Sequence, residues 1–275
     1  MSFVKSAVKK IGDVGSLRGL YLLLRMANSA VRDRLMAGAI ARGRFNRGFC
    51  PTCGKKTVFV ERNDWLRDNY FCIDCFSIPR QRAIMHVLEK EFPAWRELTI
   101  HESSAGGQSS DKIAAECLGY TSSHFLPGVT PGETHEGVRC ENLEAMTFAD
   151  DSFDLFVTQD VFEHVLDPGS AFREVARVLR PGGSHVFTIP LYPHEKSLVR
   201  SVKGEDGAIV NVEPADYHGD PREGAGWLVA TEWGEDFTKF IEDSSSLKTG
   251  VFSFKDPKLG LLGEFPEVFV STKAK

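Results

Sequence analysis

Short apolar segments alternate with helix-like segments along most of the chain. Between residues 98 and 189 the pattern runs strand, helix, strand, an order typical of a parallel sheet covered by helices on both faces. It predicts strands at 98–102, 119–124, 137–139, 153–158 and 185–189, and helices at 110–118 and 168–179. Asp167 is expected to cap the second helix and Gly182-Gly183 to end it. The fold class indicated is α/β.

The alternation of predicted strands and helices ends after residue 190. Two short apolar runs flank Lys203-Gly-Glu-Asp-Gly207 and predict a β-hairpin. A polar loop, Asp216-Tyr-His-Gly-Asp220, follows. A helix at about 234–243 and strands at about 249–254 and 267–272 are expected to complete the domain.

The amino-terminal segment has its own pattern. Leucines and a valine recur at roughly helical spacing over residues 14–42, with arginines between them. Residues 1–48 hold ten Lys or Arg against two Asp. We interpret residues 1–47 as a basic helical arm that contacts an acidic partner or a membrane surface. Packing on the chain's own acidic body and a frayed terminus are the alternatives.

Composition and charge narrow the class of protein. The chain has 275 residues, 42% hydrophobic and 26% charged, as in a soluble globular protein. No apolar run approaches the ~18–20 residues that span a bilayer, and no secretory signal is evident. We therefore expect a cytoplasmic protein, peripheral to a membrane if the arm binds one. The net charge of −5 makes nucleic acid an unlikely partner for the body of the chain.

Four cysteines form two pairs, Cys50-x2-Cys53 and Cys72-x2-Cys75. Two such turns offer four thiolates to one tetrahedral zinc ion; disulfides and redox pairs are the alternatives. With four protein ligands, the zinc would hold structure and leave no position open for chemistry. We predict a zinc ribbon at residues 48–79, called the cysteine-pair module below, and expect residues 80–275 to form the main domain. Cys117 and Cys140 stand alone and are expected to be buried.

Several later motifs resemble those of class I S-adenosylmethionine-dependent methyltransferases, most closely the type 11 group. The resemblance covers about residues 98–273. It lies in Glu102-Ser-Ser-Ala-Gly-Gly107, in the segment from Glu141 to Asp154, in Gln159-Asp-Val-Phe-Glu-His164 and in Leu179-Arg-Pro-Gly-Gly183. The cysteine pairs followed by Ser77-Ile-Pro-Arg80-Gln-Arg82 resemble a bacterial subgroup that joins such a module to this domain. The resemblance implies a Rossmann-like sheet of seven strands.

The same resemblance implies the cofactor site. The loop after the first strand would approach the methionine part of S-adenosylmethionine, although Ser104 and Gln108 replace two of the family's three glycines. The family usually has an acid at the end of the second strand, where this chain has Ser122-Ser-His124. The residues carried over as cofactor ligands are Glu102, Ser104, Gly106, Gly107, Ser123, Glu141, Asn142, Gln159 and Asp160.

Glu141-Asn142 matches the family's adenine-binding position, and a surface loop is the alternative. Gln159-Asp160 follows the fourth strand and is expected at the ligand crevice. Ubiquinone-type O-methyltransferases carry Glu-x-x-Glu-His here and bind a divalent metal. The motif Asp160-x-x-Glu163-His164 therefore leaves a metal site open as a second interpretation.

Methyl transfer to a hydroxyl releases one proton, so a base is needed. His218 is the first candidate, because it lies in the insertion 191–232 that we expect to form the acceptor pocket, and His164 is the second. The function predicted is O-methylation of a small molecule or a glycan. An RNA methyltransferase that uses the zinc module to hold RNA, and a non-catalytic scaffold of the same fold, are the alternatives.

Overall fold

The computed structural model describes residues 33–275 except 35, 205 and 219–225. Most of the predicted basic arm, and the end of the predicted loop 216–220, therefore lie outside the described residues. In the part described, no helix has the length and apolar character needed to cross a membrane.

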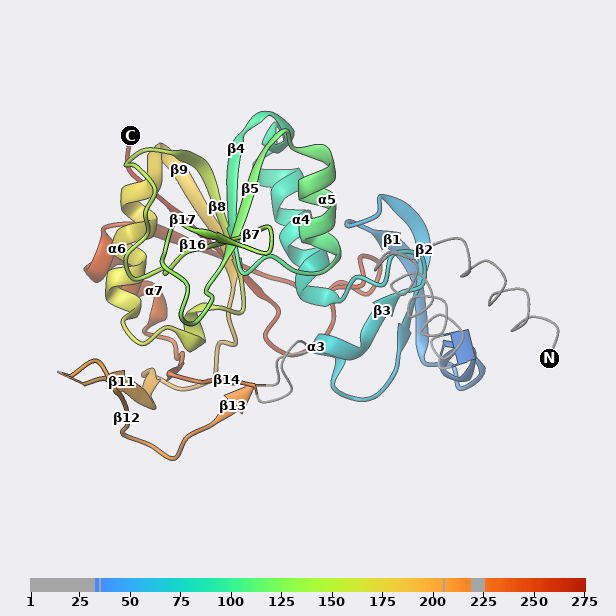
Figure 1. Cartoon of the computed structure of the whole chain (residues 1–275). Coiled ribbons are helices and arrows are strands. Elements are labelled where there is room, and N and C mark those ends of the chain that lie inside the picture. The colour runs from blue at the N-terminus through green and yellow to red at the C-terminus, as the bar shows by residue number, and fades with distance from the viewer. Residues whose placement is uncertain (1–32, 35, 205, 219–225) are drawn as a thin grey trace, which may run out of the picture.

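An eight-stranded sheet forms the centre of the molecule (Figure 1). Five strands are parallel and β17 runs antiparallel to β9. The predicted count of seven is one short, because the two-residue strand β6 turns back at Gly137 and pairs with β7. In spatial order the strands are β16 (Lys248–Ser253), β17 (Glu267–Thr272), β9 (Leu179–Thr188), β8 (Phe153–Gln159), β4 (Thr99–Ser103), β5 (Gly119–His124), β7 (Val138–Cys140) and β6 (Thr134–His135).

Helices cover both faces of the sheet, as the alternating pattern predicts (Figure 1). Helices α4 (Pro79–Glu91) and α5 (Gln108–Glu116) lie on one face, and α6 (Pro168–Val178) and α7 (Phe237–Ser245) on the other. Neighbouring residues of β9 pack into the hydrophobic clusters on opposite faces of the sheet. Val186 lies in the cluster that includes α4, and Phe187 lies in the cluster that includes α6. This period of two is what a strand buried on both faces requires.

Both bounds of α6 were predicted to within one residue, but the predicted stop at Gly182-Gly183 was wrong. The Asp167 side chain accepts a hydrogen bond from the Ser170 backbone N–H at 2.9 Å and caps the helix. The helix ends at Val178, and Gly182-Gly183 lie inside β9 instead of at a helix terminus. A Cβ at Gly183 would lie 2.9 Å from two backbone oxygens, so this glycine permits close strand packing rather than a helix stop.

The cysteine-pair module contains a three-stranded antiparallel sheet, which starts slightly before the predicted boundary at residue 48. Its strands are β1 (Phe45–Cys50), β2 (Lys55–Glu61) and β3 (Tyr70–Cys72), with the short helix α3 (Leu66–Asn69) before β3. The cysteines lie in β1 and β3 and in the turns that follow them. The strand pairing thus brings the two Cys-x2-Cys turns together.

Buried Arg82, in α4, fastens the module to the main domain. Its guanidinium donates to the carbonyl oxygens of Ser77 and Tyr70 and, at 2.6 Å, to that of Gly260 in the β16–β17 connection. It also lies over the Phe59 ring, 4.7 Å from the centroid. Because a buried cation needs its donors satisfied, these contacts fix the connection against the module.

The insertion 191–232 adds short strand pairs beyond the carboxyl end of β9. The predicted hairpin is present as β11 and β12. The elements are β10 (Leu198–Val199) with β15 (Thr231–Glu232), β11 (Ser201–Lys203) with β12 (Ile209–Asn211), and β13 (Tyr217–His218) with β14 (Trp227–Leu228). Two single 3-10 turns, Trp95–Glu97 and Phe162–His164, precede β4 and follow β8.

Gly260 tests how tightly the β16–β17 connection fits the module. It has φ +67°, and a Cβ there would lie 2.6 Å from the Phe59 ring and 2.8 Å from Arg82 Nε. Gly260→Ala should lower the free energy of unfolding by about 2–4 kcal/mol, from backbone strain plus overpacking. Gly43→Ala, at φ +70° with no atom near its Cβ, should cost only about 1 kcal/mol. Equal losses for the two variants in urea unfolding would contradict the tight fit.

Candidate functional site

Glu102, at the end of β4, is completely buried and held by side chains from three elements. Its Oε1 accepts from Ser110 Oγ at 2.8 Å and from Gln159 Nε2 at 2.9 Å, and its Oε2 accepts from Tyr120 OH at 2.8 Å. Burial raises the pKa of this carboxyl, and the three donors oppose the rise. The structure thus brings together two residues, Glu102 and Gln159, that the sequence predicted at one site.

The loop after β4 is open at Gly106 and closed at Gly107. A Cβ at Gly106 would meet no atom within 4 Å, whereas one at Gly107 would lie 1.9 Å from Gln81 Nε2 of α4. Gly107 has φ +83° and Ser104 has φ +58°. The strained serine, at a cost of about 1 kcal/mol, keeps the turn where the family has glycine. The open space over Gly106 is the part of the loop that a ligand can approach.

Ser123, predicted as a ribose contact, is committed to another residue. Its Oγ lies 2.9 Å from Nε2 of buried His101, whose Nδ1 lies 2.8 Å from Thr121 Oγ1. Burial, together with the charge of Arg139, lowers the pKa of His101 to about 3. His101 is therefore a neutral core residue, and Ser123 serves as its partner.

Glu141 and Asn142, predicted at the adenine position, hold their own loop. The Glu141 carboxylate accepts from Thr147 N at 2.9 Å, from Thr147 Oγ1 at 2.6 Å and from Arg139 Nε at 2.8 Å. The Asn142 side chain accepts from the Glu144 backbone N–H at 3.0 Å. Contact of either side chain with adenine stays a prediction, and it would have to compete with these bonds.

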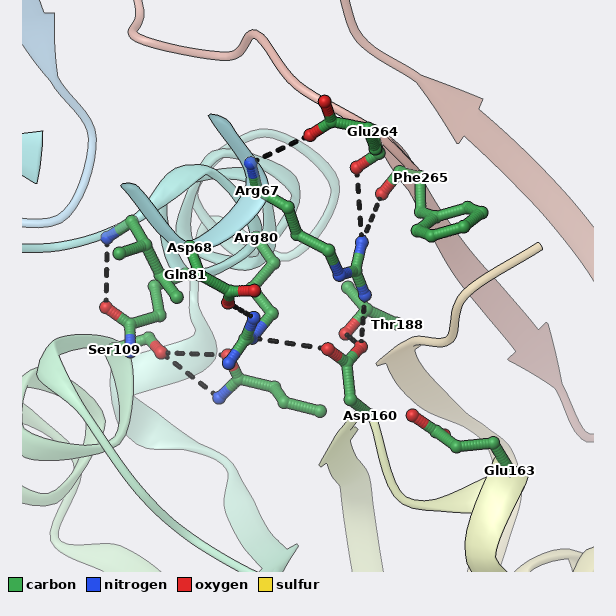
Figure 2. A network of polar contacts seen from close by, with 12 residues as sticks. Arg67, Asp68, Arg80, Gln81, Ser109, Asp160, Glu163, Thr188, Glu264 and Phe265 are labelled. Atoms are coloured by element: carbon green, nitrogen blue, oxygen red, sulfur yellow. Dashed lines mark hydrogen bonds and ion pairs between the residues drawn. The ribbon is translucent and has the colours of Figure 1, made fainter. Parts of the chain in front are cut away.

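Asp160 is the centre of a charged network that the sequence did not predict (Figure 2). Its carboxylate accepts from Arg67 Nη2 at 2.6 Å and from Thr188 Oγ1 at 2.8 Å, and lies 3.4 Å from Arg80 Nε. Burial opposes ionisation, but the two guanidinium groups outweigh it and lower the pKa of Asp160 to about 2. Arg80 also donates to Asp68.

Nothing in the sequence marked Arg67, which precedes Asp160 by 93 residues. Arg80 stood in the motif that carried the family resemblance, but without an assigned role. Because Arg67 comes from α3 and Arg80 from the first turn of α4, the module and the helix that follows it both reach Asp160 at the carboxyl end of β8.

Glu163 is a buried carboxyl without a hydrogen-bond partner among the described residues. It is 2% exposed, and neither carboxyl oxygen is bonded. Burial and the neighbouring Asp160 charge raise its pKa to about 8, against the weaker effect of the two arginines. Glu163 is therefore protonated at neutral pH. A buried polar group left unpaired is costly, and it points to a ligand that would complete its bonding.

His164 and His218, the two predicted bases, lie together beside Glu163. Their ring centroids are 5.6 Å apart at nearly a right angle, and ligand atoms of all three residues lie within 4.8 Å of one another. His164 Nδ1 lies 2.9 Å from the Leu228 carbonyl oxygen. Because a carbonyl only accepts, Nδ1 carries the proton, and Nε2 of the neutral ring is left as an acceptor. Burial, with a contribution from His218, lowers the pKa of His164.

The alternative metal set of Asp160, Glu163 and His164 is not assembled in the described structure. Asp160 turns toward Arg67 and Arg80 (Figure 2), and the third group beside Glu163 and His164 is His218 of the insertion. Two arginines paired with Asp160 also disfavour a cation at that carboxylate.

The four paired cysteines form a compact cluster. Their sulfur atoms lie within 4.8 Å of one another, with Cys50 and Cys75 3.7 Å apart and Cys53 and Cys72 3.9 Å apart. Zinc–sulfur bonds of about 2.3 Å in a tetrahedron place neighbouring sulfurs about 3.8 Å apart. The donor set and its spacing thus fit zinc. All four cysteines are free in this structure, as are Cys117 and Cys140, which are buried.

Comparison with known proteins finds methyltransferases. Residues 114–187 match the family model described as a methyltransferase domain. This span includes Glu141 and the segment from Gln159 to His164, and it leaves out the loop after β4. The match covers less than half of the chain, so it characterises this segment.

Two curated relatives have the same character. One is a ubiquinone biosynthesis O-methyltransferase of Parvibaculum lavamentivorans, 31% identical over 113 residues, which are 41% of this chain and 37% of that protein. Another is an uncharacterized methyltransferase of Mycobacterium avium, 36% identical over 103 residues, which are 36% of this chain and 39% of that protein. The chain thus spans well under half the length of the relatives it matches.

A solved structure of an S-adenosylmethionine-dependent methyltransferase from Mesorhizobium loti superposes with a TM-score of 0.46 at 16% identity, over 70% of this chain and 98% of that one. The family model alone places the similarity to methyltransferase domains in the segment that supplies β5, β7, β8, most of β9 and the Glu163–His164 pair.

Replacing Glu163 with Gln tests its protonation. The folded protein holds the Glu163 proton up to a pKa of about 8, against an ordinary value of 4.5. The unfolded chain releases it earlier, so this group makes the free energy of unfolding fall between about pH 5 and pH 8, by up to about 1.4 kcal/mol per pH unit. Glu163→Gln removes that slope and should gain stability over the wild type as pH rises. A difference between the two proteins that is equal at pH 5 and pH 8.5 in urea unfolding would contradict the raised pKa.

Proposed function

We propose that the protein is an S-adenosylmethionine-dependent methyltransferase that methylates an oxygen atom of a small molecule or a glycan. The observation that carries the proposal is a group of three side chains. Glu163 and His164 follow β8 in a segment similar to methyltransferase domains, and His218 reaches them from the insertion. The relatives named ubiquinone biosynthesis O-methyltransferases favour oxygen as the acceptor atom.

The cofactor is proposed to lie above the carboxyl ends of β4 and β8. Connections from these neighbouring strands leave to opposite faces of the sheet, toward α5 and α6, which makes their ends the crevice where open α/β sheets bind ligands. The open space over Gly106 fits a cofactor that approaches the backbone. Glu102, Ser123 and Glu141 are engaged within the chain, so the first contacts are expected from the backbone of residues 104–106.

S-adenosylmethionine would supply the electrophilic methyl group; the chain has to orient the acceptor and remove its proton. His164 is suited to the second task, because the Leu228 carbonyl fixes its Nδ1–H and leaves Nε2 as a base. Protonated Glu163 can donate a hydrogen bond to the acceptor. This assignment places His164 ahead of His218, the reverse of the order expected from sequence position.

RNA and scaffold functions have less support. The chain carries a net charge of −5, and the body outside the arm is acidic, whereas RNA-binding surfaces are basic. A scaffold without catalysis would not require an unpaired buried carboxyl beside two histidines. Binding of S-adenosylmethionine in calorimetry separates the enzyme from the scaffold.

Removing each histidine tests the base. His164→Ala should lower kcat by about 10²–10⁴-fold and leave cofactor affinity unchanged. His218→Ala should have a smaller effect, mainly on acceptor KM. Because the base acts unprotonated and its pKa lies below 6.5, wild-type kcat should rise with pH through the acidic range and be level by pH 7. Wild-type kcat in His164→Ala would remove His164 from the reaction, and absence of cofactor binding by the wild type would reject the proposed function.

Zinc bound by Cys50, Cys53, Cys72 and Cys75 is proposed as a structural ion. Cys72→Ser should lose the metal, measured by elemental analysis, and lower the unfolding temperature because metal binding stabilises small modules directly. Cys117→Ser, at a cysteine outside the cluster, is the control and should retain one zinc per chain. Wild-type protein purified without chelator and free of zinc would contradict the proposal.

A further inference from the structure

Two arginines converge on Asp160 from outside the main sheet (Figure 2). Arg67 Nη2 donates to one carboxylate oxygen at 2.6 Å, and Arg80 Nε lies 3.4 Å from the other. Arg80 is in turn held by Asp68 of α3. Both contacts therefore depend on the seating of the cysteine-pair module.

Arg67 is itself held rigidly. It is 4% exposed, its Nη1 donates to the Phe265 carbonyl oxygen at 2.8 Å, and its backbone N–H donates to Glu264 Oε2 at 3.0 Å. A guanidinium fixed at several donors loses little further freedom on pairing. The Arg67–Asp160 ion pair therefore fixes the end of β8 relative to the module and to the β16–β17 connection.

Asp160 is the point at which the chain turns from β8 toward the histidines. Its φ of +53° lies in the left-handed region, which residues other than glycine adopt uncommonly, although Asp enters it more readily than most. Glu163 and His164 follow within four residues. The His164 amide bonds to the Val161 carbonyl, and the Ala230 amide bonds to the Glu163 carbonyl. The turn at Asp160 thus determines where the side chains of Glu163 and His164 stand.

We propose that Arg67 and Arg80 are positioning residues for the reaction, acting through Asp160. They hold segment 160–164 in the conformation that presents Glu163 and His164 to the acceptor. The cysteine-pair module and the start of α4 are then parts of the reaction site rather than an appended binding domain. The inference about turnover rests on the proposed function; the inference about the segment's conformation does not.

Docking of the module by itself does not require this network. Arg82 fastens the module through Ser77, Tyr70 and Gly260 without touching Asp160. An arginine pair that served only docking would have no reason to meet at Asp160, the residue at which the turn carrying Glu163 and His164 begins.

Hydrogen exchange of the protein without cofactor tests the conformational step. In Arg80→Met and in Asp160→Asn, the amides of His164 and Ala230 should exchange at least about 10-fold faster than in the wild type. The double variant should exchange no faster than Asp160→Asn, because Arg80 is proposed to act on the segment only through Asp160. Arg96→Met removes an arginine paired with Glu89 and Glu116 away from this site and should leave both amides unchanged. Unchanged exchange in Arg80→Met and Asp160→Asn would overturn the proposal.

Kinetics test the catalytic step. Arg80→Met should lower kcat about 10-fold with little change in acceptor KM, and Arg80→Lys, which keeps the charge, should recover most of the loss. A purely structural role predicts a lower active fraction with normal kcat per folded molecule and no advantage for Lys. That pattern would overturn the positioning role. If the wild type neither binds cofactor nor turns over, the proposed function fails, while the exchange result still decides whether the arginines hold the segment.

Discussion

The ion pair between Arg67 and Asp160 is the interaction on which the arrangement of the crevice depends. Each charge is nearly buried, with side-chain exposures of 5% and 18%, and a buried charge without its partner is strongly destabilising. The pair requires that the end of β8, the β16–β17 connection and α3 meet at one place. Once they do, Arg80 and Thr188 complete the bonding of the carboxylate. The turn at residues 160–164, which carries Glu163 and His164, then starts from a residue that is held in place.

The Arg67–Asp160 pair gives the module a role in positioning the residues after β8, in addition to the metal binding that its cysteines suggest. The proposed zinc ion would explain how so small a sheet remains folded. The contacts of Arg67, Asp68, Arg80 and Arg82 hold the sheet in its place. Gln81 extends the same contact to the loop after β4 through Gly107. The module and α4 therefore touch both loops that border the crevice, and a change in the module's seating would be felt at each.

Much of the fold could be predicted because strand and helix periodicity are local. Val186 and Phe187 face opposite cores from neighbouring positions of one strand, and Asp167 caps α6 through a contact three residues away. The failures are long-range. Gly182-Gly183 resembles a helix stop, but the pair sits inside β9, where close approach of neighbouring backbone decides its role. Arg67 and Asp160 carry no local signal of their pairing across 93 residues.

The candidate site divides in the same way. Motif order predicted Glu102 and Gln159 at one site, and it named His164 as a candidate base. His218 was predicted from its position in the insertion, and its proximity to His164 came only from the structure. Motif order does not reveal that Thr147 and Arg139 occupy the Glu141 carboxylate, or that Glu163 is left unpaired, because satisfaction of a buried polar group depends on every neighbour.

A crystal structure with bound S-adenosylhomocysteine tests the central claim most directly. The account predicts the ligand above the carboxyl ends of β4 and β8, against the open face of Gly106, with its sulfur directed toward His164 and with Arg67 still paired to Asp160. A ligand bound elsewhere, or none at saturating concentration, would contradict it.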